Sequence, residues 1–135
     1  MMINEHELAT ISKHELPIKI FVMNNGGYGM MQQTQEVWLG SRYEASTKKD
    51  FDLPDFSEIA RAHGIQKVEK IDSHKNLYKQ IKKVLNYDGP VLCDVKIHPK
   101  ARIFPKLSFG KPIEDSEPLL ERKEFLENMI ISPLK

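Results

Sequence analysis

The chain has 135 residues, of which 40% are hydrophobic and 29% charged, and its formal net charge is +1 at pH 7. This is the composition of a globular protein of about one domain with a sizeable core. The near-neutral charge gives no electrostatic case for nucleic acid or an anionic membrane as partner. The sequence has no apolar run near the ~20 residues of a membrane span and no signal-peptide pattern. The single cysteine, Cys93, excludes a disulfide framework, so we expect a reducing cytoplasmic setting.

The first half of the chain reads as helix, strand, helix and loop. Asn4 is predicted to cap a first helix, with a glutamate three residues later as in a capping box. Residues 18–23 form an apolar, β-branched run typical of a buried parallel strand. A second helix is expected over residues 28–38. Residues 40–54 show no periodicity and are predicted to be a loop, long enough to suggest a function such as covering a ligand.

The second half continues this alternation. A helix is expected from Pro54, closed by Gly64, followed by a weaker strand at residues 65–71. Asp72 or Ser73 is predicted to cap the next helix. Its buried stripe is expected to consist of Leu77, Ile81, Val84 and Leu85. Residues 90–97 form the second clear strand.

This order predicts an α/β fold, a three-layer sandwich with a mainly parallel sheet and helices on both faces. Beyond residue 98, prolines break the chain into an extended segment with one short helix at residues 119–128. We therefore expect a domain at residues 1–110 and an extended C-terminal arm at residues 111–135.

The turn at residues 24–27, Asn-Asn-Gly-Gly, joins the first strand to the second helix. Glycine permits positive φ and close backbone approach, and a helix N-terminus favours an anion in front of it. Amide oxygens suit a hard cation. Ligands bind open α/β sheets at the carboxyl ends of strands, where this turn lies. From these residues alone, an ordinary glycine-rich connection and a site for a cation with a phosphate group are equally good interpretations.

Other catalytic patterns are absent from the sequence. It contains neither of the common glycine-rich phosphate fingerprints, no defensible serine triad, and no histidine pair at metal-ligand spacing. Cys93 is flanked by apolar residues and is interpreted as a small buried hydrophobe. We therefore assign no catalytic residue to this chain.

Several motifs share their order and spacing with a known family. They run from about residue 3 to residue 110 and include Asn4, Glu7, Leu8, Pro17, Asn24, Asn25, Tyr28, Gly29, Met30, Gln33, Gln35, Pro54, Asp55, Phe56, Gly64, Asp88, Gly89, Pro90, Phe104 and Pro105. Together they closely resemble the C-terminal, diphosphate-binding domain of thiamine-diphosphate enzymes, with the acetolactate synthase branch as the nearest match. Thr34 stands where that branch usually carries tryptophan, so the resemblance does not settle the substrate.

The resemblance implies a thiamine-diphosphate-binding fold and assigns roles to the turn. The Asn25 side chain and the Gly27 carbonyl oxygen would ligate Mg²⁺, and Gly26 would belong to the same cofactor-binding turn. Tyr28, Gly29 and Met30 would line the cofactor and substrate side, and Gln33 and Gln35 would line the next turn of the helix. The parent reaction would be decarboxylation of a 2-oxo acid and carbon–carbon ligation, catalysed by a transferase or lyase.

The resemblance also implies that part of the site lies elsewhere. The Gly-Asp-Gly half of the family's metal motif is expected upstream of Met1, so we expect a fold truncated at its N-terminus, inactive alone and weak in cofactor binding. Such a chain would work in a homo-oligomer. The alternative is a non-catalytic assembly or regulatory module that retains the fold; a nucleotide-binding α/β domain is a weaker third reading.

Overall fold

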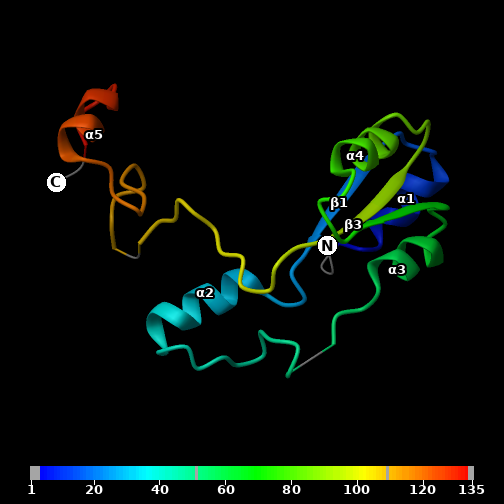
Figure 1. Ribbon diagram of the computed structural model, residues 1–135, viewed down its shortest axis with the longest axis horizontal. Coiled ribbons are helices and arrows are strands. Elements are labelled where there is room, and N and C mark those ends of the chain that lie inside the picture. Colours follow the sequence, from blue (N-terminus) through cyan, green and yellow to red (C-terminus); the bar gives the residue numbers. More distant parts are fainter. Residues whose placement is uncertain (1–3, 51, 109, 134–135) are drawn as a thin grey trace. The chain divides into compact units, whose positions relative to one another are not determined.

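The computed structural model describes residues 4–50, 52–108 and 110–133. The elements follow in the order α1 (Glu7–Lys13), β1 (Lys19–Asn24), α2 (Gly29–Trp38), α3 (Phe56–Ala62), β2 (Lys67–Ile71), α4 (Leu77–Leu85), β3 (Val91–Lys96) and α5 (Arg122–Asn128). They fall into two compact units, Met1–Ala101 with the sheet and α1 to α4, and Arg102–Lys135 with α5 (Figure 1).

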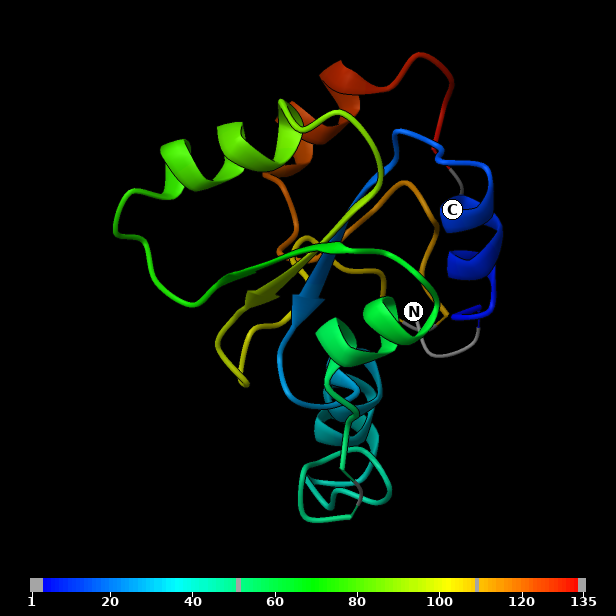
Figure 2. The same ribbon diagram turned by 90° about the vertical axis from the view of Figure 1, so that its right-hand side faces the viewer.

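A parallel sheet of three strands, in the order β1-β3-β2, forms the centre of the first unit (Figure 2). Lys19 of β1 and Lys67 of β2 both lie opposite Val91 of β3, so the strands start level and their carboxyl ends meet at one edge. Val91, Leu92 and Cys93 are completely buried. A strand covered on both faces of a parallel sheet needs such a continuous apolar run. The predicted α/β fold is confirmed.

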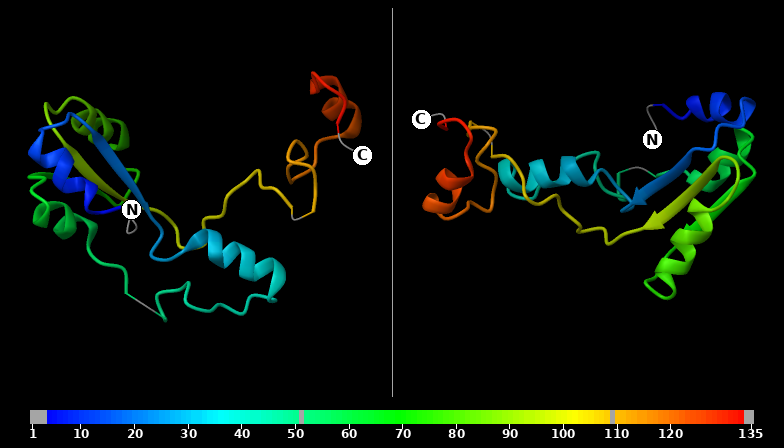
Figure 3. Two further views of the ribbon diagram at one scale, coloured as in Figure 1. Left: turned by 180° about the vertical axis from the view of Figure 1, so that it is seen from behind. Right: turned by 90° about the horizontal axis from the view of Figure 1, so that it is seen from above.

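Helices cover the two faces of this sheet. On one face, Leu92 belongs to a core with side chains from α1 and α3, namely Leu8, Phe56, Ala60 and, just before β2, Ile65. On the other face, Cys93 belongs to a core under α4, with Ile71, Val84 and Val91. The right-hand view of Figure 3 shows α1 and α4 on opposite sides of the strands. Successive residues of β3 thus serve opposite layers, as the alternation of a strand requires.

The start of α3 is fixed by Asp55. Its carboxylate accepts hydrogen bonds from the backbone N–H groups of Ser57 at 2.8 Å and Glu58 at 3.3 Å. Lys70 Nζ on β2 donates to its other oxygen at 2.8 Å, and this bond is the main cause that lowers the pKa of Asp55 to about 2. At the other end, Gly64 has a φ of 90° and closes the helix, as predicted.

The predicted start of the first helix is wrong. α1 begins at Glu7, and His6 occupies the N-cap position without a capping side chain. Asn4 contributes only its carbonyl oxygen, which accepts a hydrogen bond from Glu7 N at 3.2 Å. The chain turns through residues 4–6 by backbone bonds, so the side-chain cap is not used.

The predicted start and face of α4 also need correction. The helix begins at Leu77 and not directly after Asp72 or Ser73, because Asn76 has a φ of 57°. A residue in that left-handed conformation cannot continue a right-handed helix. At the other end, Leu85 is 55% exposed. The stripe that packs on the sheet therefore consists of Leu77, Ile81 and Val84.

The second unit is built around α5. Glu121 caps the helix by accepting two backbone N–H groups at 2.9 and 3.1 Å, which lowers the pKa of its carboxyl. Arg122 donates to both carboxylate oxygens of Asp115, at 2.9 and 3.1 Å, and lies over the Phe125 ring. Phe125 is buried. In the part of the chain that the structure describes, no helix has the length and apolarity needed to cross a membrane.

Candidate cofactor site at the end of the first strand

The turn at residues 24–27 is held by its own two asparagines. Asn24 is the last residue of β1, and its carbonyl oxygen accepts a hydrogen bond from Ile97 N at 2.9 Å. Its side-chain Oδ1 accepts from Gly26 N at 3.0 Å, and Asn25 Oδ1 accepts from Gly27 N at 3.3 Å. Gly26 has a φ of 73°, which favours glycine. The predicted turn therefore has a defined geometry.

Two glycines of the site leave no room for a side chain. A Cβ atom on Gly27 would lie 2.7 Å from Gln32 Nε2 and 2.8 Å from Ser46 O. A Cβ atom on Gly29 would collide with the side-chain nitrogen of Asn25. The backbone is thus packed closely between the Asn25 amide, α2 and the following loop. We call this closely packed turn the cradle. At Gly26, where a Cβ atom would meet nothing within 4 Å, it exposes main chain to open space.

α2 holds the loop that follows it through two buried glutamines. Gln32 Nε2 donates to Ser46 O at 2.6 Å, and the backbone N–H of Tyr28 donates to the same oxygen at 3.0 Å. Gln35 Nε2 donates to Glu44 O at 2.8 Å, and its Oε1 accepts from Ser46 Oγ at 2.6 Å. Ser46 is fully buried. The predicted loop is therefore tied to α2 at its middle.

The structure contradicts the expectation for Gln35 and brings two further residues, Gln32 and Ser46, to the junction of α2 and the loop. Gln35 was expected to continue the cofactor-lining surface along α2, but it is 7% exposed and bonded to the loop. Gln32 and Ser46 were not singled out from the sequence. The only local signal is the spacing of the two glutamines, which puts them on one side of a helix. Their partner lies in an irregular segment that periodicity cannot place.

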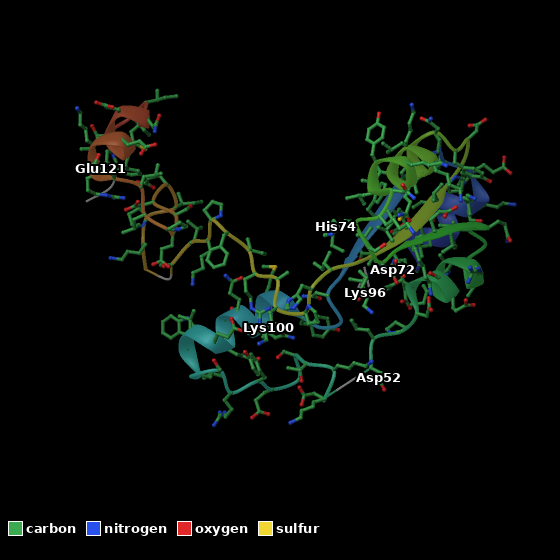
Figure 4. The ribbon with its side chains drawn as sticks, in the orientation of Figure 1. Asp52, Asp72, His74, Lys96, Lys100 and Glu121 are labelled. Carbon is green, nitrogen blue, oxygen red and sulfur yellow. The ribbon has the colours of Figure 1, made fainter. Side chains whose placement is uncertain are left out.

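A cavity of about 640 Å³ lies at the carboxyl ends of the three strands. The turn contributes Asn24, Asn25 and Gly26, and the ends of β2 and β3 contribute mainly charged residues. The charged side chains of its wall are Lys48, Asp52, Lys70, Asp72, Asp94 and Lys96. Figure 4 shows Asp72 and Lys96 at the ends of their strands and Asp52 on the loop before α3. The cavity wall thus carries both positively and negatively charged side chains beside the turn.

The N-terminus of α2 follows the turn closely in the chain and carries a positive field. The helix is ten residues long and has no acidic residue in its first turn. Its backbone dipole is therefore not compensated there, and it favours an anion. Tyr28 precedes the helix and Met30 lies in its first turn, and both are exposed. The residues predicted to bind the cofactor, 25–30, thus lie at the junction of β1 and α2.

The described residues offer only part of the ligands of a metal site. No group of three or more histidine, cysteine, aspartate or glutamate side chains that could hold a metal occurs in residues 4–50, 52–108 and 110–133. The Asn25 amide oxygen and the Gly27 carbonyl are hard oxygen donors, which suit Mg²⁺. The turn and this donor set fit a Mg²⁺–diphosphate group, in which phosphate oxygens and water are further ligands of the kind that Mg²⁺ prefers.

Cys93 takes no part in this site. It is completely buried in the core under α4, and burial raises the pKa of its thiol to about 11. A thiol with this pKa is protonated at neutral pH and is a weak nucleophile. Its interpretation as a small buried hydrophobe agrees with this environment.

Residues 1–95 match the family model described as thiamine pyrophosphate enzyme, C-terminal TPP binding domain. Over 108 residues the chain is 35% identical to an acetolactate synthase large subunit of Pyropia yezoensis, covering 80% of this chain and 18% of that protein. It is 34% identical over 107 residues to the mitochondrial acetolactate synthase of Schizosaccharomyces pombe, covering 79% and 15%. The large subunit of Escherichia coli isozyme 2 is 34% identical over 109 residues, covering 81% and 19%. The chain therefore spans less than a fifth of these relatives.

Proposed function

The chain belongs to the thiamine pyrophosphate enzyme family through its C-terminal TPP-binding domain, and on that premise we propose that it supplies half of a Mg²⁺–diphosphate site in an acetolactate synthase-like enzyme. The complete enzyme decarboxylates a 2-oxo acid and ligates the remaining carbon unit to a second carbonyl compound. When bound, thiamine diphosphate supplies the nucleophilic carbon and electron sink of this chemistry.

In this proposal, the residues of this chain bind the cofactor and orient it. Asn25 Oδ1 and the Gly27 carbonyl oxygen would hold Mg²⁺, and the uncompensated dipole at the start of α2 would favour the negative charge of the phosphates. Tyr28, Gly29 and Met30 would form the wall toward the cofactor and substrate. The observation that carries this proposal is the cavity of about 640 Å³ at the carboxyl ends of the strands, to which the turn contributes Asn24, Asn25 and Gly26. A Cβ atom on Gly26 would meet nothing within 4 Å, and exposed main chain at the carboxyl end of a parallel strand suits a phosphate group.

Self-association belongs to the same proposal. Met30, Met31 and Val37 on α2 are between 54% and 70% exposed, next to the proposed cofactor wall. Apolar side chains gathered beside a site favour burial against another chain. We infer a homo-oligomer, in the cytoplasm, and an isolated chain that is inactive because its metal shell is incomplete. Sedimentation velocity over a range of concentrations tests the association.

Magnetic resonance of the full 135-residue chain tests the site. The ¹⁵N-labelled chain is titrated with Mg²⁺ and thiamine diphosphate to millimolar concentrations. We expect shifts confined to residues 25–30, reversed by a chelator and lost in Asn25→Ala. Thr34→Ala is the matched control, because the Thr34 hydroxyl bonds only within α2, to Met30 O at 3.2 Å, and is exposed.

Three results would contradict the proposal. Shifts that survive in Asn25→Ala, or that occur without Mg²⁺, would show that the ligand binds elsewhere. A complete absence of localised shifts would favour the alternative, a module that keeps the fold for assembly. The reaction itself is tested with the complete enzyme, which should release carbon dioxide from a 2-oxo acid only when both Mg²⁺ and thiamine diphosphate are present.

A further inference from the structure

We propose that Asp94 is a positioning residue for the turn at residues 24–27. Its carboxylate holds the Asn24 side chain in the one orientation that also fixes the backbone of Gly26. The role in cofactor binding rests on the proposed function, whereas the effect on the turn does not. Asp94 lies 70 residues from Asn24 along the chain and belongs to the central strand.

The sheet register brings the two side chains together. Asn24 lies opposite Lys96, so Asp94, two residues earlier on β3, projects from the same face of the sheet. Lys70 lies opposite Asp94 on β2, but its Nζ donates to Asp55 at 2.8 Å. Asp94 accepts instead from Asn24 Nδ2, with its Oδ2 at 3.3 Å.

A single orientation of the Asn24 side-chain amide satisfies both of its hydrogen bonds. Its nitrogen donates to a carboxylate oxygen of Asp94, and its oxygen accepts from Gly26 N at 3.0 Å. If the amide were flipped, oxygen would face oxygen on one side and nitrogen would face an N–H group on the other. The carboxylate thus selects the rotamer that holds Gly26 at a φ of 73°. Gly27, the proposed metal ligand, follows directly.

Asp94 is not placed for stability alone. Its Oδ1 is buried and has no hydrogen-bond partner among the described residues. A buried oxygen without a partner costs stability, so an apolar side chain of similar size relieves that cost while it removes the bond to Asn24. Asp94→Val therefore separates the two roles. Replacing a purely structural residue would lower the unfolding midpoint. Replacing a positioning residue would instead change the amide signals of the turn.

The experiment compares Asp94→Val, Asp94→Asn and Asp72→Asn in the full ¹⁵N-labelled chain without ligand. In Asp94→Val we expect the Gly26 and Gly27 amide signals to move and Gly26 to exchange about tenfold faster, as expected for the loss of one charge-assisted bond. The thermal midpoint should change by only a few degrees. Asp94→Asn, which keeps an acceptor, should restore the signals. Asp72→Asn changes a carboxylate of the same cavity wall and should leave them unchanged.

Unchanged Gly26 signals in Asp94→Val would overturn the proposal, as would equal effects of Asp72→Asn. If Asp94→Val does not fold, Asp94→Ala removes the acceptor instead. It should move the Gly26 signal in the otherwise unchanged chain and have no further effect on it once Asn24→Ala is present. Titration with Mg²⁺ and thiamine diphosphate then separates the two hypotheses. No binding by the unmodified chain contradicts the proposed function and leaves the turn result standing. Binding that Asp94→Val does not weaken contradicts a role in cofactor binding.

Discussion

Replacing Asp55 by alanine should weaken the first unit in a way that depends on pH. The substitution removes the N-cap of α3, with its two backbone acceptor bonds, and the ion pair to Lys70. Loss of an aspartate cap costs about 1 kcal/mol, and a surface ion pair contributes between about 0 and 1 kcal/mol. We therefore expect the free energy of unfolding to fall by about 1–2 kcal/mol.

The pKa of Asp55 supplies an independent measure of the same interactions. A drop from its ordinary value of 3.8 to about 2 corresponds to at most about 2.4 kcal/mol. Asp55 and Lys70 side chains are 43% and 56% exposed, so solvent screening reduces this to about 1 kcal/mol. Because the folded-state pKa is lowered, the stabilisation is fully present above about pH 4. It is lost as the pH falls toward 2.

Urea unfolding of the chain and of Asp55→Ala, followed by circular dichroism at several pH values, measures both effects. The difference in unfolding free energy should be about 1–2 kcal/mol at pH 6 and should shrink between pH 4 and pH 2. Lys70→Met is the matched control, because it removes the ion pair and keeps the cap, and it should cost less than 1 kcal/mol. A difference between the two chains that is the same at pH 6 and pH 2 would refute the reasoning.

Three further experiments test the core and the cradle. Gly27→Ala should lower the free energy of unfolding by about 1–3 kcal/mol and weaken Mg²⁺-dependent binding, because the new Cβ atom overlaps Gln32 and Ser46. An unchanged free energy of unfolding would contradict this packing. Leu92→Ala should cost about 2–5 kcal/mol, whereas Leu85→Ala, at a 55% exposed position, should cost less than 1 kcal/mol in the same urea titration. Cys93 should resist a thiol reagent at pH 8 until urea unfolds the chain, and immediate labelling of the native chain would show that it is not buried.

Local patterns predicted those features that depend on neighbours along the chain. The apolar runs of β1 and β3, the loop after α2 and the turn at residues 24–27 all follow from residue type and spacing within a few positions. Gly64 closes α3 because glycine accepts a positive φ at little cost. Predictions failed where a single residue changed the local path. Asn76, in a left-handed conformation, delays α4, and no periodicity marks it in advance.

The sequence by itself determined the alternation of helices and strands, the family resemblance and the residues of the proposed cofactor turn. Only the tertiary structure decided the strand order β1-β3-β2, the burial of Gln35 against the loop and the placement of Asp94 beside Asn24. The physical reason is that hydrophobic periodicity records which face of an element is buried, but not which element covers it. The contacts that shape the turn join residues far apart in the chain, so they exist only once the sheet register is set.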